Sequence, residues 1–246
     1  MKSLFHAFVM CQSMFCAIPC PVQIWDEQAR DKLLWCLPLV GLEIGLVWWL
    51  GSLLCDFLAL PVLVQGAVLC AAPWILTGNI HLDGFMDVTD AVRSCRDLDR
   101  RREILKDSHV GSFAVIGSIL LALFQFAVCT AAPNWADARM LILIPVVSRC
   151  ASAVAVAVLP KMSTSQYVQK KARAADICIP GAALLLCLAG ALCIWPTYVW
   201  VVAAELIVYG LALRRAYKSL GGMNGDISGY CLTLAELGAL GAMALL

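Results

Sequence analysis

Residues 33–55 read LLWCLPLVGLEIGLVWWLGSLLC and contain a single charged side chain, Glu43. A helix that crosses a bilayer needs about 20 mainly apolar residues, so this stretch has the length and composition of a membrane span. Apolar runs of similar length, bounded by charge, proline or glycine, recur along the chain. They predict about seven spans, over residues 33–55, 57–77, 112–133, 139–160, 177–195, 197–213 and 230–246.

The overall composition agrees with this interpretation. The 246 residues are 62% hydrophobic and only 14% charged, whereas soluble globular chains carry about 25% charged residues. The apolar runs follow one another without a polar linker, so we expect one all-α domain over residues 1–246, a polytopic bundle in the lipid bilayer. The net charge of +1 gives no general attraction to nucleic acid, and no nucleic-acid partner is expected. The 13 cysteines are scattered without a CxxC pair, which indicates small apolar residues.

The basic residues predict an orientation. With seven spans and a cytoplasmic N-terminus, 16 of the 18 Lys and Arg residues fall on one side of the membrane. Short loops rich in these residues stay in the cytoplasm. We therefore expect the polar loops 78–111, 161–176 and 214–229, and any chemistry they perform, to face the cytoplasm.

An acidic motif follows the second predicted span. Residues 77–91 read TGNIHLDGFMDVTDA, with Asn79 as the expected N-cap of a helix. Asp83, Asp87 and Asp90 then fall within an arc of about 60° on one helical face. Like charges at this spacing repel, so the pattern favours a bound cation.

Carboxylate ligands without thiolates indicate Mg²⁺ or Mn²⁺. Gly84 leaves room for a phosphate or a metal to approach the backbone. The alternative is a solvated helix face on which Asp90 pairs with Arg93.

A second polar motif, KDSHVG at residues 106–111, precedes the third predicted span. It returns Lys106 and Asp107 to the membrane surface near the first motif. Ser108 is either a helix cap or a substrate contact. His81, two residues before Asp83, is a candidate phosphate contact or proton carrier.

Charged residues inside the spans need partners. Arg149 lies in the middle of a predicted span, where a charge costs at least about 2.5–3.5 kcal/mol. It either pairs with one of the intramembrane acids, Glu43, Glu205 or Glu236, or contacts a substrate phosphate. Residues 220–230, LGGMNGDISGY, form a glycine-rich approach to the last span and add one more acid, Asp226.

Taken in order, the motifs TGNIHLDGFMDVTDA, KDSHVG, VSR and GGMNGDISGY closely resemble the cobalamin synthase family of adenosylcobinamide-GDP ribazoletransferases. The resemblance spans nearly the whole chain, including IPCP at residues 18–21 and PLVG at residues 38–41. Three positions depart from the family pattern: Ala17 stands where a basic residue is common, Asn224 where threonine is usual, and Thr233 where many members have an acid. Contacts that those family groups make are not carried over to this chain.

The resemblance implies a multi-pass enzyme of a bacterial or archaeal cytoplasmic membrane. In its reaction the 5′ oxygen of α-ribazole, or of α-ribazole 5′-phosphate, attacks the phosphoryl group attached to cobinamide in adenosylcobinamide-GDP, and GMP leaves. Applied to this chain, it implies that Asp83, Asp87 and Asp107 bind Mg²⁺. Asp90 or His81 would remove the hydroxyl proton, and Lys106 and Arg149 would neutralise the charge of the phosphate. Gly84, Ser108 and Asp226 are the expected substrate contacts. Whether the chain acts as a monomer or a homo-oligomer is left open.

Two other functions are weighed against this one. The Asp-Gly pattern is similar to that of membrane CDP-alcohol phosphotransferases, which act on lipids, but their pattern has Ala-Arg where this chain has Asp87-Val88. A cation or proton transporter would use the intramembrane acids with Arg149 as a pathway. Against transport, 7 of the 17 acids lie between Asp83 and Asp107, and no inverted repeat is visible.

Overall fold

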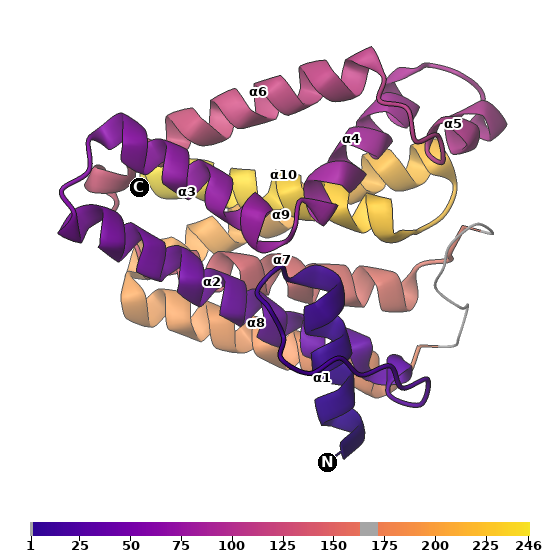
Figure 1. The fold of residues 1–246 in the computed structure, drawn as a ribbon, viewed down its shortest axis with the longest axis horizontal. Helices are drawn as coiled ribbons and strands as arrows, with labels where there is room; N and C mark the ends of the chain where they lie inside the picture. The colour runs from indigo at the N-terminus through magenta and orange to yellow at the C-terminus, as the bar shows by residue number, and fades with distance from the viewer. Residues whose placement is uncertain (1, 163–171) are drawn as a thin grey trace.

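The computed structural model describes residues 2–162 and 172–246, and this part of the chain is built from helices without a β-strand (Figure 1). Residues 163–171, which belong to the expected 161–176 loop, lie outside the described residues. Short 3₁₀ turns occur at Arg30–Lys32, Ala132–Asn134 and Pro196–Tyr198. The α-helices are α1 (Lys2–Phe15), α2 (Leu33–Phe57), α3 (Val62–Leu76), α4 (Ile80–Arg93), α5 (Leu98–Ile104), α6 (Ser112–Cys129), α7 (Met140–Val158), α8 (Ala174–Ile194), α9 (Val199–Leu220) and α10 (Gly225–Leu245).

The polytopic helical fold is confirmed, with one difference in the count of spans. Within the described ranges, six segments are long and apolar enough to cross a membrane; they contain α2, α6, α7, α8, α9 and α10. The predicted span 57–77 forms α3, which has only 15 residues. It passes the same test only together with α4, from which it is bent by 89°. The count is therefore six, or seven if the bent pair is one span.

The bend between α3 and α4 has a local cause. Gly78 and Asn79 both adopt left-handed backbone conformations, with φ of 61° and 62°, which a continuing right-handed helix cannot contain. The hydroxyl of Thr77 donates to the carbonyls of Pro73 and Trp74 and closes the end of α3. Asn79 is the N-cap residue of α4 by position, but its side chain makes no capping hydrogen bond, which corrects its expected role. The turn lets the acidic helix leave the axis of α3.

The inner helices approach closely where small residues meet. A Cβ added at Gly41 would lie 2.5 Å from the carbonyl oxygen of Pro145, and one added at Gly45 would lie 2.3 Å from that of Ile142. These contacts seat α2 directly against α7, the kind of packing by which spans associate in lipid. The other neighbours of α7 include α8, α9 and α10. The arrangement buries the middle of α7, including Arg149.

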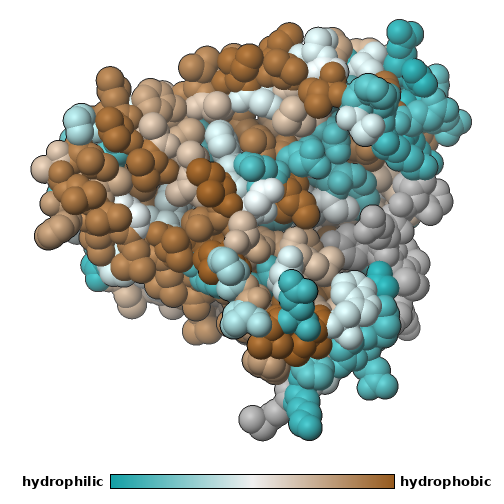
Figure 2. Space-filling model, viewed as in Figure 1, coloured by the Kyte–Doolittle hydropathy of each residue, from teal (hydrophilic) through white to brown (hydrophobic). Residues whose placement is uncertain are grey.

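One end of the molecule is polar and the rest is largely apolar. In the space-filling view, hydrophilic residues gather at the end that contains α5 and the chain between α9 and α10, and hydrophobic residues cover the opposite end (Figure 2). Outward side chains on α3, α6 and α8 are apolar and exposed, as expected for helices that face lipid; they include Leu63, Leu123, Phe124, Leu185 and Leu186. All 13 cysteines are free. The acidic helix α4 lies outside the six spans and runs toward the polar end (Figure 1).

Candidate functional site

The acidic face of α4 meets the start of α10. Asp83 is exposed and Asp87 is half-buried, and Asp226 joins them from the first turn of α10. Gly84 explains the close approach, since a Cβ there would lie 2.9 Å from the backbone oxygen of Asp226. The space that we expected a phosphate or metal to fill is thus taken by the backbone of α10. Gly84 serves helix packing, which corrects its expected role as a substrate contact.

The three carboxylates form a concentration of like charge. Burial, first, and then the charges of Asp83, Asp226 and Asp90 raise the pKa of Asp87 from 3.8 to about 6. In the described part of the chain, neither Asp83, Asp87 nor Asp226 forms an ion pair with a basic side chain. Asp226 accepts one neutral hydrogen bond, from Asn224 Nδ2 at 2.6 Å. We call Asp83, Asp87 and Asp226 the acidic mouth; uncompensated charge of this kind is typical of a functional site.

Asp107 does not join this cluster. It lies in the exposed loop between α5 and α6, where its Oδ1 accepts from the backbone N–H of His109 at 3.0 Å and lies 2.6 Å from His109 Nδ1. The hydrogen bond from the backbone N–H of His109, followed by the one from its side chain, lowers the pKa of Asp107. Among the described residues, no three His, Cys, Asp or Glu side chains come together as a metal cage. The expected set of Asp83, Asp87 and Asp107 is therefore not assembled.

The acids on this face of α4 offer hard carboxylate oxygens. Mg²⁺ is commonly held by one or two carboxylates, with water and substrate phosphates completing an octahedral shell. Asp83 and Asp87 offer ligands of the kind that such a partial shell uses, whereas the described residues do not bring Asp83, Asp87 and Asp226 together as a set of three ligands. They do not fit a closed structural site made by protein ligands alone.

Asp90, unlike the other acids of α4, binds the start of α6. Its Oδ2 accepts from the backbone N–H of Gly111 at 2.6 Å, and its Oδ1 accepts from that of Ala114 at 2.9 Å. Both oxygens thus bind the first turn of α6, whose N–H groups would otherwise lack partners. The alternative pairing of Asp90 with Arg93 is not formed, and Ser108 is not the cap of α6. Lys106 and Ser108 are exposed in the adjoining loop.

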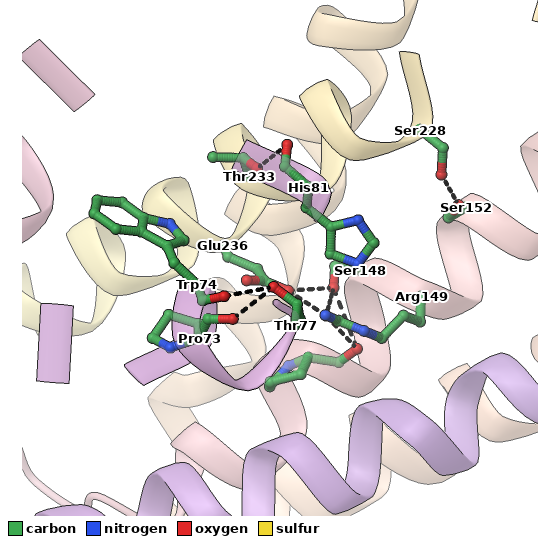
Figure 3. A network of polar contacts seen from close by, with 11 residues as sticks. Pro73, Trp74, Thr77, His81, Ser148, Arg149, Ser152, Ser228, Thr233 and Glu236 are labelled. Carbon is green, nitrogen blue, oxygen red and sulfur yellow. Dashed lines mark hydrogen bonds and ion pairs between the residues drawn. The ribbon is translucent and has the colours of Figure 1, made fainter. Parts of the chain in front are cut away.

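His81 lies at the inner end of the acidic helix. Its ring stacks on Phe15, with centroids 6.4 Å apart and planes 17° apart, and its backbone oxygen accepts from the Thr233 hydroxyl at 3.2 Å. The imidazole points toward the side of Ser148 and Arg149 (Figure 3). Its Nε2 is buried and has no hydrogen-bond partner among the described residues. This nitrogen is therefore available to a ligand, but burial, first, and then the charge of Arg149 lower the pKa of His81 from 6.5 to about 3 and disfavour a proton there.

Arg149 is paired with an acid inside the bundle. Its Nη1 donates to Glu236 Oε1, to Ser148 Oγ at 3.0 Å and to the carbonyl of Pro145 at 3.2 Å (Figure 3). Of the three acids considered, Glu236 is its ion-pair partner. Glu43 instead accepts from Gln12 on α1 at 2.9 Å. The Nε and Nη2 atoms of Arg149 are buried and lack partners among the described residues.

Sequence reasoning missed the small polar residues that join α7 to α10. Ser148 also donates to Glu236, at 2.8 Å, and Ser152 is hydrogen-bonded to Ser228. Ser148 and Ser152 are four residues apart, so they share a helix face with Arg149 between them in sequence. That spacing inside an otherwise apolar span is the signal that would have found them. Asn224, a departure from the family pattern, caps α10 by accepting from the backbone N–H of Ile227 at 3.0 Å.

Comparison with known proteins now identifies the family. The family model for cobalamin-5-phosphate synthase (CobS) matches residues 7–244. The chain is 36% identical to the adenosylcobinamide-GDP ribazoletransferase of Clostridium perfringens strain SM101, with 96% of each chain covered. Its identity is 34% to the protein of that name from Clostridium botulinum strain Alaska E43, again with 96% of each covered. For the one from Lachnoclostridium phytofermentans it is 31%, with 96% of this chain and 91% of the relative covered.

No solved structure matches the chain. The relatives cover the acidic helix, the buried arginine and the polar end together, and they do not favour a lipid phosphotransferase or a transporter. The resemblance inferred from the motifs is therefore confirmed along nearly the whole length. This chain is a multi-pass membrane protein that belongs to the cobalamin-5-phosphate synthase family.

Proposed function

We propose that this protein is an adenosylcobinamide-GDP ribazoletransferase. In the proposed reaction, the 5′ oxygen of α-ribazole or its 5′-phosphate forms a bond to the phosphorus attached to cobinamide. The bond from that phosphorus to the bridging oxygen breaks, GMP leaves, and the hydroxyl proton passes to a base. The observation that carries the proposal is the uncompensated acidic cluster of Asp83, Asp87 and Asp226 in a chain whose relatives bear this name over 96% of its length.

The acidic cluster is suited to the donor diphosphate only with a cation between them. Carboxylates and phosphates repel, so the face of α4 is useful to this reaction when it presents a divalent metal. Bound Mg²⁺ would supply charge neutralisation at the phosphoryl oxygens. We assign Asp83 and Asp87 as its protein ligands, with Asp226 next to them from α10. The placement of Asp107 as a third ligand stays a prediction, because the loop that carries it is exposed and apart from the other two.

The hydrogen bonds of Asp90 and His81 bear on which residue accepts the proton of the attacking hydroxyl. Both oxygens of Asp90 are engaged by the N-terminus of α6, so Asp90 is assigned as a positioning residue that fixes α6 against α4. His81 keeps Nε2 without a hydrogen-bond partner among the described residues, so it is free to contact the attacking hydroxyl. Burial, first, and then the charge of Arg149 lower the pKa of His81 to about 3, which disfavours it as the proton acceptor, so the identity of the base stays a prediction. Thr233 holds the backbone of His81 from α10 and so helps to fix the direction of the ring.

Basic side chains meet the phosphate charge from two sides. Lys106 and Ser108 lie in the exposed loop before α6, the same loop as Asp107, and their contact with a substrate phosphate stays a prediction. Arg149 holds Glu236 through Nη1 and has two further donor nitrogens, Nε and Nη2, that have no hydrogen-bond partner among the described residues. We propose that these inner donors bind a phosphoryl oxygen when substrate enters between α4 and α7. Preorganised donors of this kind stabilise developing charge without reorganisation.

The orientation of the site follows from charge. The basic residues of α5 and of the last turns of α9 lie at the same end as α4 (Figures 1 and 2), and Arg139 lies near the other end, paired with Asp137. By the positive-inside rule, we propose that the acidic mouth faces the cytoplasm of a bacterial inner membrane.

The direct test is product analysis. Purified protein in detergent is incubated with adenosylcobinamide-GDP, α-ribazole and Mg²⁺, and cobalamin and GMP are both quantified with and without EDTA. We expect equimolar products that disappear with EDTA. Replacing α-ribazole by its 5′-phosphate then shows which acceptor is preferred. A folded sample that releases CMP from a CDP-linked lipid, and no GMP from adenosylcobinamide-GDP, would overturn the proposal.

A further inference from the structure

A groove runs along the side of the molecule opposite to the acidic face of α4. It encloses about 340 Å³ between α4, α6, α9 and α10. Its α4 wall contains Phe85, Thr89 and Arg93. Phe85 and Thr89 each follow one of the acids Asp83 and Asp87 by two residues, about 200° around the helix, so they point away from those acids. The groove is thus separate from the site described above.

The wall of the groove is apolar and partly aromatic. Leu120, Leu121 and Phe124 line it from α6, and Leu234 and Leu237 line it from α10. Phe85 and Tyr230 stack in the same groove, with ring centroids 5.7 Å apart and planes 12° apart. Phe124 is 63% exposed on a helix that faces lipid, so one side of the groove is continuous with the outer apolar surface.

The rim of the groove at the polar end is basic. Arg93, the last residue of α4, and Arg215, in the last turns of α9, both line it and are both exposed. Each charge is close enough to act electrostatically on the Tyr230 hydroxyl. Neither arginine forms an ion pair or side-chain hydrogen bond with the rest of the described chain, in contrast to Arg100 with Glu103. Two unpaired guanidinium groups therefore stand at the end of an apolar channel, at the level where the spans meet the polar end.

We propose that this groove binds one anionic phospholipid of the surrounding bilayer. The phosphate of the headgroup would lie between Arg93 and Arg215, and an acyl chain would run along α6 and α10. The chemistry is complementary at both ends, because guanidinium groups bind phosphate and the apolar wall suits a hydrocarbon chain. Basic residues near the membrane surface are known to favour anionic lipids. The inference does not rest on the proposed function, since lipid binding needs no substrate.

The test is lipid binding by the full-length protein in detergent, read by native mass spectrometry. Phosphatidylglycerol and phosphatidylcholine with identical acyl chains are titrated separately, and glycerol phosphate serves as the headgroup without chains. We expect one saturable phosphatidylglycerol, weaker binding of phosphatidylcholine and no retained glycerol phosphate. The double variant Arg93→Gln/Arg215→Gln should weaken phosphatidylglycerol binding roughly 30-fold, from the attraction that each basic residue contributes.

The matched control is Arg96→Gln/Arg214→Gln. These two arginines are exposed neighbours of the first pair but do not line the groove. Because exposed charges outside the groove interact weakly with a lipid bound in it, their loss should leave phosphatidylglycerol binding within about twofold of wild type. A second variant, Leu234→Trp, fills the groove without changing charge and should also abolish the bound lipid. Equal binding of the two lipids, or equal loss in both double variants, would overturn the proposal. A wild-type dimer that the Arg93→Gln/Arg215→Gln change dissociates, with no lipid bound, would assign the groove to a second copy of the chain instead.

Discussion

The molecule has two charged regions, one in which a basic and an acidic side chain are paired and one in which acidic side chains lack basic partners among the described residues. Around Arg149, deep between α7 and α10, a positive charge meets Glu236 and a serine hydroxyl, and the ion pair is almost fully buried. On α4, Asp83 and Asp87 meet only another acid, Asp226, and no basic partner among the described residues. A buried ion pair adds little net stability, because desolvation offsets its attraction, but removal of one partner leaves an uncompensated buried charge and is strongly destabilising. Uncompensated charge at the mouth opposes folding, which indicates that binding or chemistry maintains it.

The largest effect should come from breaking the buried pair. Arg149→Met leaves Glu236 as a buried acid without its partner, and such losses cost about 3–5 kcal/mol. We expect the variant to lose that much unfolding free energy in an SDS titration of detergent-solubilised protein. The double variant Arg149→Met/Glu236→Gln should recover most of it, since no charge is then stranded. An Arg149→Met protein as stable as wild type would show that the two regions do not differ.

The acidic mouth should respond in the opposite way. Asp83→Asn removes an exposed carboxylate from a repulsive cluster, so stability should be unchanged or higher. Turnover should fall at least about 100-fold, the scale seen when one electrostatic stabiliser is removed from an active site. Asp99→Asn, an exposed acid on α5, is the matched control and should retain full turnover. Full turnover by Asp83→Asn at saturating Mg²⁺ would refute the metal assignment.

Asp90 shows that an acid of the same sequence motif can have a structural role. It shares the sequence motif of the mouth but binds the N-terminus of α6, so it should behave as a structural residue. Asp90→Ala should cost about 0.5–2 kcal/mol of unfolding free energy, as loss of a helix cap does. Asp97→Ala, which removes the cap of the short helix α5, should cost less because no α5 residue is buried. Equal costs in the two variants would argue against this distinction.

The smallest effect is a pH dependence. The pKa of Asp87 is raised to about 6 in the folded state, against 3.8 as its ordinary value. The unfolded state therefore releases this proton at lower pH than the folded state does. The stabilising contribution of Asp87 is complete below pH 3.8 and is lost as pH rises through about 6. With EDTA present, thermal melts of Asp87→Asn should show a weaker decline across this window than wild type, and an unchanged profile would contradict the pKa shift.

Local sequence determines most of the fold and the identity of the mouth. The length of the apolar runs locates the spans, and helical spacing alone places Asp83 and Asp87 on one face of a helix. The exception is residues 57–77, where hydropathy predicts a span of ordinary length and α3 begins only at Val62. The first residues of this stretch belong instead to the end of α2 and to a turn that contains Ala59 in a left-handed conformation and Pro61, and hydropathy does not register this turn.

Long-range geometry decides what local sequence leaves open. Three intramembrane acids are equivalent partners for Arg149 by sequence, and the packing of α7 on α10 selects Glu236. Glycine at position 84 permits close approach, but the group that approaches is the backbone of α10 rather than a ligand. Asp90 shares a helix face with its acidic neighbours, although its partners lie 21 and 24 residues farther along the chain. In each case the deciding contact joins elements that are distant in sequence.

The most direct test of the difference between the regions is ion binding itself. Mn²⁺, substituting for Mg²⁺, is titrated into the purified protein with adenosylcobinamide-GDP but without α-ribazole, and free Mn²⁺ is followed by electron paramagnetic resonance. We predict one bound ion for wild type and for Arg149→Met/Glu236→Gln, and none at the same concentration for Asp83→Asn/Asp87→Asn. Equal Mn²⁺ binding by wild type and the double aspartate variant would contradict the account.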